Sequence, residues 1–575
     1  IDKDYTGYLN YYEGMILAVS ILTVFAVSYF IVKKRTRVKA LVLTVFLVFL
    51  TIMPLTSRIL VFTKHSYRWT FMICFVEALV IGCFLQEGFR EKNRKTVLAG
   101  SILAIIICGG LLVWMYSFKN IKPDHKVTAG VIGFFAVYLI LFAVGTSVKK
   151  MYRIFPAAVL MVLICELFVL DYPSLWHRES PTRNQVATEY YNDGTKEAVA
   201  MLKEQDDSVY RIEKSYTSAS ENDGMSQGYN GLSVYMSTNP ASLVAYHKMY
   251  GPETLSGNFV DFNMDDYIRS SLLGTKYLIT GTGYHAPQKI YTSVGEAGGR
   301  SVFENQYALP FGYLYDKEWN QEEVKEMSGL DKTLASLSGF YYTDAEETSS
   351  YQKADLPEQT DLSLLDYADT ATDCTMEKGS EGITVSNLGA DPNVVFPGVA
   401  SCFADNDKLY GLSLTVDAPD ETEMAVYYQT EGDEGFSAEK VYTFKVTEDN
   451  RTWEHLVPGG ITELRVDVSS PVESAVINNF ELKSCDITES GYTALKESGV
   501  DEVTFSDSTY QAQVTNDASE NKMLCVPLFY QKGWTAQIDG EDAGVYNINE
   551  GMCGVEVPSG THEIVLKYET VNAEK

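Results

Sequence analysis

Six apolar runs crowd into the first 170 residues of the chain, and they constrain its fold more than any other feature. Each run holds roughly 15 to 22 residues, close to the ~20 residues that an α-helix needs to cross about 30 Å of hydrocarbon. The runs are Tyr12–Val32, Ala40–Pro54, Phe71–Phe89, Val97–Phe118, Val131–Val148 and Ile154–Leu170. We therefore expect residues 1–171 to form an all-α transmembrane bundle of about six helices.

Lysine and arginine cluster in alternate loops between these runs. Residues 33–39 contain five of them, residues 90–95 four, and residues 149–153 three. Short cytoplasmic loops of membrane proteins are enriched in both residue types, so these three loops are predicted to be cytoplasmic. The chain is then a multi-pass protein of the cell membrane, and everything after residue 171 is predicted to be extracytoplasmic.

The remainder of the chain is strongly acidic. Up to Asp171 there are 19 Lys and Arg against 9 Asp and Glu, whereas the rest has 27 against 67, a net charge of −40. Binding to nucleic acid depends on Lys and Arg at the phosphates. This imbalance therefore argues against nucleic acid as a partner.

After Leu170 long apolar runs give way to short periodic ones. TKEAVAMLKEQ from Thr195 has apolar residues at helical spacing, and SVYRIEKS from Ser208 alternates like a strand. MDDYIRSSLLG and TKYLIT repeat this order further on. Residues 172–342 are therefore predicted to form a mixed α/β domain.

The last 230 or so residues have the pattern of all-β structure. Residues 343–365 are polar and are predicted to be a linker. Alternating runs such as YGLSLTVDA, EMAVYYQT and ELRVDVSS predict a β-sandwich at 366–488, a candidate glycan-binding module. Hairpin signals such as Asp539-Gly540 then predict a small terminal β domain at 489–575.

Two carboxylates, Glu77 and Glu166, interrupt the apolar runs, and a charged loop follows the second run. A charge inside a membrane is costly and commonly faces a cavity or a partner. One interpretation is an outer-leaflet site for a lipid phosphate or a sugar. The other is that the charged groups pair with one another and hold the bundle together. The loop residues in question are Arg58, His65, Arg68 and Trp69.

In the outer part, the segment GYNGLSVYMSTNPASLVAYHKMYG suits loops that line a groove, and it supplies Tyr229, Asn230 and Asn239 as candidate binding residues. Ordinary packed turns are the alternative. No P-loop, HExxH, GxSxG or GxGxxG motif occurs at a useful position, and the seven histidines show no ligand spacing, so no metal site is predicted. Cys525 and Cys553 form either one disulfide across adjacent strands or two buried thiols.

Several strings together resemble the YfhO family of bacterial membrane proteins. They are SYRWTFM, YNGLSVYMSTN, SLLGTKYLIT, VFENQYALPFGYLYD and LFYQKGWTAQIDGEDAGVYNINEGMCGVEVPSGTHEIVLKYE. The last string has GW, then DG, then a glycine-rich turn, then PSGTH before an alternating strand. The resemblance spans nearly the whole chain.

The resemblance implies a GT-C-type glycosyltransferase that moves a sugar from a polyprenyl phosphate, a membrane lipid, to a cell-envelope glycopolymer such as lipoteichoic acid. Such enzymes use a divalent metal or basic residues at the phosphate, which fits Arg58 and Arg68. The resemblance also implies a catalytic acid upstream of residue 1 and a further transmembrane helix after the last β unit, so this chain is expected to be a fragment without the catalytic acid. The alternative is a non-enzymatic envelope protein, either a transport component or an assembly scaffold.

Overall fold

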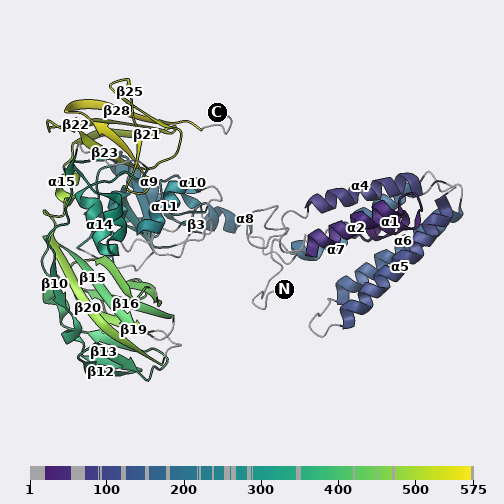
Figure 1. The fold of residues 1–575 in the computed structure, drawn as a ribbon, viewed down its shortest axis with the longest axis horizontal. Helices are drawn as coiled ribbons and strands as arrows, with labels where there is room; N and C mark the ends of the chain where they lie inside the picture. The colour runs from purple at the N-terminus through teal and green to yellow at the C-terminus, as the bar shows by residue number, and fades with distance from the viewer. Residues whose placement is uncertain are drawn as a thin grey trace. The chain divides into compact units, whose positions relative to one another are not determined.

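The chain consists of two compact units, Ile1–Pro181 and Thr182–Lys575 (Figure 1). The computed structural model describes these residues: 20–52, 71–88, 90, 93–117, 125–148, 154–176, 182–216, 218, 222–235, 239–250, 259–260, 267–281, 286–287, 289–344, 351–418, 421–448, 450–468 and 473–570.

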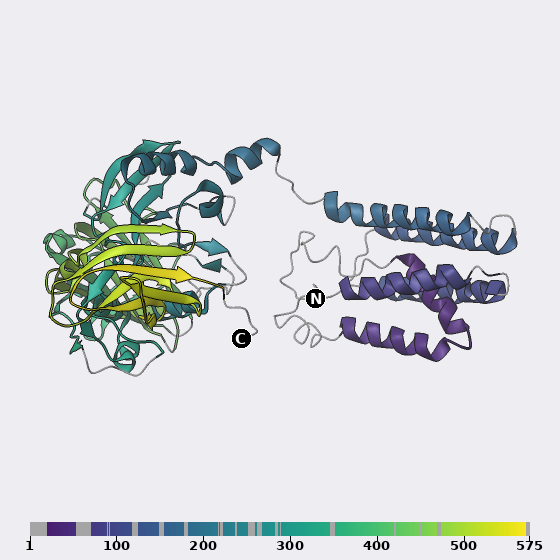
Figure 2. The same ribbon diagram turned by 90° about the horizontal axis from the view of Figure 1, so that it is seen from above.

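The first unit is helical, and most of its helices run alongside one another (Figure 2). Its described helices are α1 (Ile21–Val32), α2 (Arg37–Ile52), α4 (Phe71–Gly88), α5 (Arg94–Ser117), α6 (His125–Ser147) and α7 (Phe155–Trp176). Each of the predicted apolar runs overlaps one of them. Two stretches, Arg94–Trp114 and Thr128–Ser147, are long and apolar enough to cross a membrane, and two further apolar helical stretches are shorter. The number of crossings and their orientation stay predictions.

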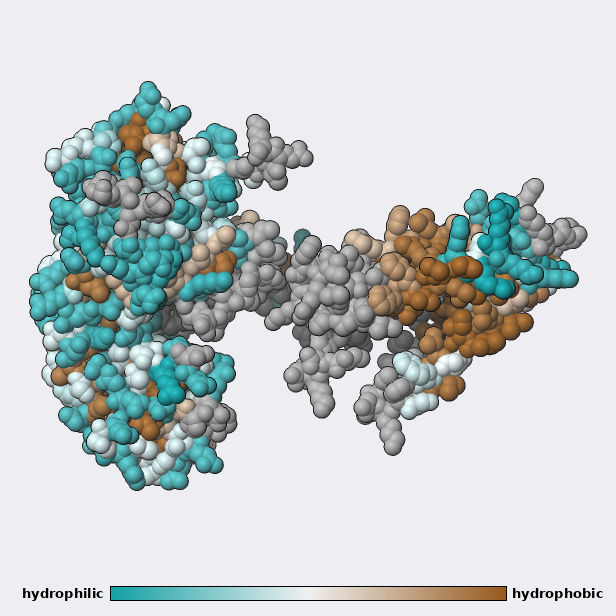
Figure 3. Space-filling model, in the orientation of Figure 1, coloured by the Kyte–Doolittle hydropathy of each residue, from teal (hydrophilic) through white to brown (hydrophobic). Residues whose placement is uncertain are grey.

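Aromatic rings fill the interior of the helical unit. The ring centroids of Phe25 and Phe142 lie 4.9 Å apart, and those of Phe84 and Phe142 lie 5.7 Å apart. Helices α1 and α5 approach closely at Gly100, where a Cβ atom would come within 2.9 Å of the Tyr29 Cα atom. Apolar side chains also cover the outside, as Ile106 on α5 shows with 64% of its surface exposed (Figure 3). An apolar exterior of this kind suits a surface that contacts lipid.

The second unit begins with the mixed α/β part that the sequence predicts. Strand β1 pairs in parallel with β4, which pairs with β6, and β5 forms the edge of the sheet. Its apolar face packs against α9 (Thr195–Gln205), which covers the predicted helix. The strands are β1 (Arg211–Lys214), β4 (Thr275–Thr280), β6 (Arg300–Asn305) and β5 (Tyr291–Ala297). Around them lie α8 (Arg183–Gln185), the π-helical turn Val186–Tyr190, α10 (Asp223–Gln227), α11 (Ala241–Tyr250), α12 (Tyr267–Leu272), α13 (Gln321–Glu326), α14 (Gly329–Ser338), and the short paired strands β2 (Val234–Tyr235) with β3 (Phe259–Val260) and β8 (Lys317–Glu318) with β9 (Gln352–Lys353).

Two sheets face each other in a β-sandwich, and the predicted alternating runs form its strands. One sheet has the order β12 (Thr375–Gly379), β13 (Gly382–Ser386), β20 (Ser474–Asp486), β15 (Lys408–Asp417) and β18 (Thr452–Val457), and β10 (Thr360–Ser363) also pairs with β20. The other has the order β11 (Thr370–Thr372), β14 (Asn393–Phe396), β19 (Ile461–Val468), β16 (Thr422–Thr430) and β17 (Val441–Val446). Short 3-10 turns lie at Leu365–Tyr367 and Val399–Phe403. Alternate side chains of both sheets, such as Leu412 and Val466, point inward and are fully buried.

Two further sheets and the short helix α15 (Tyr492–Lys496) complete the unit. One sheet has the order β21 (Val500–Ser506), β22 (Thr509–Asn516), β28 (Gly560–Tyr568), β24 (Trp534–Ile538) and β25 (Glu541–Ala543). The other has β26 (Tyr546–Ile548), β27 (Met552–Val557), β23 (Lys522–Phe529) and β7 (Tyr313–Tyr315). Because β7 comes from the α/β part, chain segments about 200 residues apart share one sheet. The domain boundaries proposed from the sequence, including a linker at 343–365, stay predictions.

Cys525 and Cys553 lie on the paired strands β23 and β27, and both are buried free thiols. In the register of this pair Cys525 faces Gly554, and Cys553 faces Val526. Side chains alternate between the faces of a strand, so this offset of one residue directs the two thiols into different cores. The structure therefore has the buried thiols and not the disulfide.

Candidate functional site

The predicted site residues fall into a membrane group and an outer group. Of the membrane group, Arg58, His65, Arg68 and Trp69 lie outside the described residues, and their role stays a prediction. Glu77 and Glu166 are described, and both side chains are buried in the helical unit.

Glu166 on α7 is held by hydrogen bonds from two other helices. Its carboxylate accepts from the Ser20 hydroxyl at 2.8 Å, from the Ile21 backbone N–H at 2.6 Å and from the Tyr138 hydroxyl at 2.6 Å. Ser20 is the N-cap of α1, so the carboxylate sits at the positive end of that helix. This arrangement joins α1, α6 and α7 around a single buried carboxyl group.

Glu77 on α4 differs from Glu166. Its Oε2 atom is buried, and it has no hydrogen-bond partner among the residues that the structure describes. A buried carboxylate oxygen without a partner costs free energy. Glu77 therefore has a carboxylate oxygen that could accept a further hydrogen bond. The three hydrogen bonds that Glu166 accepts are sufficient to stabilise it in the interior.

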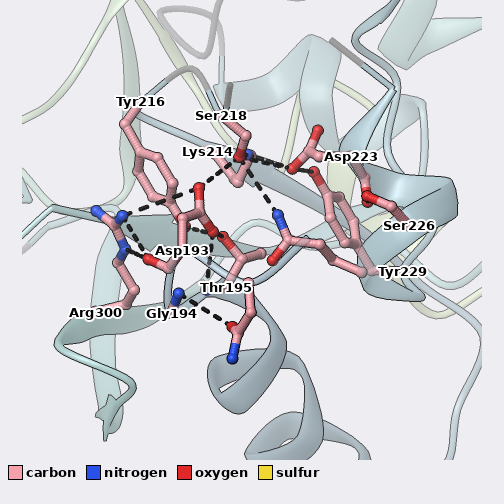
Figure 4. A network of polar contacts seen from close by, with 12 residues as sticks. Asp193, Gly194, Thr195, Lys214, Tyr216, Ser218, Asp223, Ser226, Tyr229 and Arg300 are labelled. Carbon is pink, nitrogen blue, oxygen red and sulfur yellow. Dashed lines mark hydrogen bonds and ion pairs between the residues drawn. The ribbon is translucent and has the colours of Figure 1, made fainter. Parts of the chain in front are cut away.

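In the second unit, one of the predicted outer residues, Tyr229, adjoins a network of four charged side chains from α10, β1, β6 and the turn before α9 (Figure 4). Lys214 forms an ion pair with Asp223, and each side chain is 9% exposed. The Ser218 hydroxyl lies between the charges: it accepts from the Lys214 ammonium at 2.5 Å and is 2.6 Å from the Asp193 carboxylate and 3.1 Å from that of Asp223. Arg300 donates two hydrogen bonds, of 3.0 and 2.7 Å, to the backbone carbonyl of Asp193. Two cations thus balance two anions.

The aromatic ring of Tyr216 lies against both cations of this network. The Arg300 guanidinium carbon is 3.8 Å from the ring centroid, and the Lys214 ammonium is 4.6 Å from it. Cations over an aromatic face are attracted by its quadrupole. The Tyr216 hydroxyl also lies 2.5 Å from the Thr195 hydroxyl, and burial raises the pKa of Tyr216 to about 12.

The ionisation of Asp193 follows from its hydrogen bonds. Burial by itself would raise the pKa of this carboxyl, but hydrogen bonds from Ser218 and Thr195 outweigh that effect and hold the pKa at about 2. Asp193 is therefore a permanent acceptor at neutral pH. The turn Asn192-Asp193-Gly194 before α9 places it there, because Asp193 Oδ1 accepts from the Thr195 backbone N–H at 3.2 Å.

The predicted outer residues are only partly brought together. Tyr229 joins the network, since its hydroxyl donates to Asp223 at 2.7 Å and burial raises its pKa. The Asn230 side chain instead contacts the Tyr210 carbonyl at 3.5 Å. Asn239 precedes α11, and its buried amide group has no hydrogen-bond partner among the described residues.

Sequence reasoning missed the four charged members, Asp193, Lys214, Asp223 and Arg300. They are spread over more than 100 residues, and no motif links them. The only local signal was the Asn-Asp-Gly turn before the predicted helix. These charged groups pair with one another. The network therefore holds the surrounding loops in place and does not present a reactive group. The described part of the chain contains no cluster of three or more His, Cys, Asp or Glu side chains that could hold a metal ion.

The apolar helices of the first unit and the sheets of the second define a membrane protein that carries a large β-rich part. The family model described as "Bacterial membrane protein YfhO" matches residues 2–571, and the chain belongs to this family. The uncharacterized protein YfhO of Bacillus subtilis (strain 168) is 21% identical over 536 residues, which cover 88% of this chain and 58% of that relative. The chain thus spans less than two thirds of the length of this relative.

Among solved structures, the arabinofuranosyltransferase AftD from mycobacteria is similar at 10% identity, with a TM-score of 0.13, over 40% of this chain and 29% of that one. The C-terminal carbohydrate-binding module CBM6 of LamC from Zobellia galactanivorans is 13% identical, with a TM-score of 0.15, over 22% of this chain and 100% of that one. Similarity at these scores bears on neither the fold of the whole chain nor its function.

Proposed function

We propose that this chain is the C-terminal part of an integral membrane glycosyltransferase that moves a sugar from a polyprenyl-phosphate donor to a cell-envelope polymer such as lipoteichoic acid. The family match over residues 2–571 carries the proposal, because the resemblance to that family implies this type of enzyme. Helices α5 and α6 support it, since each contains a stretch that is long and apolar enough for the membrane in which a polyprenyl lipid resides.

In this proposal the helical unit crosses the membrane about six times and the residues after 171 lie outside the cytoplasm. The basic loops at 33–39, 90–95 and 149–153 support that orientation. Sugar transfer then takes place on the outer side, where the acidic second unit meets the envelope polymer. The β-sandwich at 366–488 is the proposed glycan-binding part.

The proposed site for the lipid phosphate is the loop with Arg58 and Arg68, beside His65 and Trp69. Guanidinium groups match phosphate oxygens with paired hydrogen bonds, which supports arginine in this role. Glu77 belongs to the sugar side of this proposed site, where its carboxylate oxygen, which lacks a partner among the described residues, would accept from a sugar hydroxyl. A divalent metal in the full-length enzyme would serve the same phosphate. We assign no catalytic residue in this chain.

The proposal is tested in a bacterial strain that lacks the full-length protein. NMR spectra of purified lipoteichoic acid are expected to lose their glycosyl substituents in the deletion strain and to regain them with the wild-type protein. Arg68→Ala is expected to reduce the substitution at least about tenfold, because charge-assisted hydrogen bonds contribute roughly 1.5–3 kcal/mol. Lys64→Ala in the same loop is the matched control and retains it. Unchanged polymer in the deletion strain would contradict the proposal.

The alternative function, a transport component or an assembly scaffold, predicts a different outcome in a reconstituted system. Full-length protein in lipid vesicles, supplied with a polyprenyl-phosphate sugar and the polymer, transfers the sugar only if the protein is an enzyme. Substitution of an Asp or Glu in the first outer loop of the full-length protein should then abolish transfer. No transfer by the wild-type protein would favour the scaffold.

A further inference from the structure

A cavity of about 430 Å³ lies in the second unit between the edge of the α/β sheet and the loop that joins β16 to β17. Strands β5 and β6 form one wall, and residues 430–433 together with Lys440 of the sandwich form the other. Its volume falls within the range of about 300–1,000 Å³ that is typical of small-molecule sites. No residue predicted as a site from the sequence lines it.

The sandwich wall of this cavity is held rigidly by a buried ion pair. Lys440 is 4% exposed, and its ammonium lies 2.8 and 2.7 Å from the two Asp433 carboxylate oxygens and 2.7 Å from the Thr430 hydroxyl. The Thr430 backbone N–H also donates to Asp433 at 2.7 Å. Burial would raise the pKa of Asp433, but hydrogen bonds from Lys440 and Thr430 lower it. The loop is therefore fixed before any ligand arrives, which reduces the entropy cost of binding.

The sheet wall supplies aromatic rings and hydroxyl groups. Tyr291 and Phe303 contribute rings, while Thr292 and Ser293 contribute hydroxyls, and Ser293 faces Phe303 across the β5–β6 pair. The Thr292 hydroxyl accepts from the Gln306 amide at 3.0 Å, so its own proton is left to donate.

Two hydrogen bonds join the α/β part, which supplies one wall, to the sandwich, which supplies the other. The Lys289 ammonium donates to the Asn406 side-chain oxygen at 2.5 Å, and the Tyr267 hydroxyl donates to the Val457 carbonyl at 3.4 Å. Lys289 and Tyr267 belong to the α/β part, whereas Asn406 and Val457 belong to the sandwich. The cavity is thus a preformed feature of the second unit.

The charge of the lining selects the class of ligand. The charges of Lys440 and Asp433 cancel, which leaves the exposed Glu431 carboxylate, and that group has no hydrogen bond or ion pair among the described residues. A net negative lining repels phosphate-rich polymers. A sugar ring without charge fits instead, because its hydroxyls donate to a carboxylate and its C–H faces pack on aromatic rings.

We propose that this cavity binds a neutral sugar unit, with Glu431 accepting from the sugar hydroxyls and Tyr291 or Phe303 packing on the ring. The identification of this sugar as a substituent of the envelope polymer rests on the proposed function. Binding itself depends on the lining alone.

The test uses the whole chain in lipid nanodiscs and saturation-transfer NMR with glucose, galactose and N-acetylglucosamine as separate probes. At least one sugar is expected to receive saturation through Glu431, whereas any saturation of glycerol phosphate is expected to be independent of that residue. Glu431→Gln should raise the dissociation constant of the sugar about tenfold or more, because a hydrogen bond to a charged group is stronger than one to a neutral group. Glu434→Gln, an exposed acid of the same loop that does not line the cavity, is the matched control and should stay within twofold.

Three results would overturn the inference: saturation of none of the sugars, glycerol phosphate binding that is lost in Glu431→Gln, or equal weakening of sugar binding by Glu431→Gln and Glu434→Gln. Tyr291→Ala is a second test, because it removes a ring from the edge strand and leaves the buried ion pair intact. This variant should also weaken sugar binding. Sugar binding by the purified chain is independent of the deletion strain. Either proposal can therefore fail while the other holds.

Discussion

Replacing Lys214 by Met removes one charge from the polar network and keeps most of the side-chain volume. In the wild-type protein the Lys214 ammonium pairs with Asp223 and contacts Ser218, and both members of the ion pair are 9% exposed. The variant leaves the Asp223 carboxylate buried without its cation, close to Ser218, which also donates toward Asp193. Breaking a buried pair by removing one partner costs about 3–5 kcal/mol. We expect Lys214→Met to destabilise the α9–β1 region by that amount.

Amide hydrogen exchange in the full-length protein measures this loss locally. A loss of about 3–5 kcal/mol accelerates exchange through local opening roughly a hundredfold to a few thousandfold. The affected amides should be those of α9 and β1. Lys325→Met is the control, because Lys325 pairs with Glu322 on the surface, where the two side chains are 40% and 77% exposed. Exposed pairs of this kind contribute about 0–1 kcal/mol.

The double variant decides whether the charge itself is responsible. Asp223→Asn combined with Lys214→Met leaves neither charge unpaired, so exchange should slow again relative to Lys214→Met alone. If the losses of the two single variants simply add, the ion pair is not the source of the stability. If Lys214→Met exchanges like the Lys325→Met control, the reasoning is refuted altogether.

Three further predictions concern other polar contacts. The pKa of Asp193 near 2 lies below its ordinary value of 3.8. The ionised Asp193 carboxylate therefore contributes about 2 kcal/mol to the free energy of unfolding above pH ~4, and this contribution is lost as the pH falls toward 2. Urea unfolding of Asp193→Asn across that range should lack this pH dependence. The hydrogen bond from His562 to Asp539, at 2.7 Å, raises the pKa of His562, so the stability it gives is complete below pH ~6.5 and disappears as the pH rises through the raised value. Melting temperatures of wild type and His562→Gln should then converge toward pH 9. In the helical unit, Glu166→Leu strands three buried donors and should lower the melting temperature in detergent more than Glu166→Gln, and equal melting would contradict the role of its hydrogen bonds.

Elements with a strong hydrophobic period were predictable from the sequence. The segment TKEAVAMLKEQ forms α9, TKYLIT forms β4, and the alternating runs form strands such as β15 and β19. These patterns indicate which face of a helix or strand is buried, and the spacing of the buried residues distinguishes a helix from a strand. The two thiols show the limit of such reasoning, because both strands were correctly expected while the offset of one residue between Cys525 and Cys553 was not visible.

The polar network was not predictable for a related physical reason. Arg300 contacts Asp193 across 107 residues of sequence, and Asp193 contacts Ser218 across 25. A local pattern records the period of an element but not which turn will meet which strand. Tyr229 was selected because its loop is rich in Tyr and Asn. Its partner in the structure, Asp223, belongs to a short helix that no hydrophobic period in the sequence predicts.

Polar groups at candidate sites differ in how much of their hydrogen-bonding capacity the chain itself uses, and this difference separates two kinds of site. The Glu166 carboxylate accepts three hydrogen bonds from the chain, and the charges around Ser218 neutralise one another, so both arrangements are complete without a ligand. Glu431 lines a rigid cavity with its capacity unused among the described residues. A ligand gains most where the protein has already ordered the walls and left an acceptor free. The cavity beside β5 therefore meets the requirements of a binding site more fully than the charged network around Ser218.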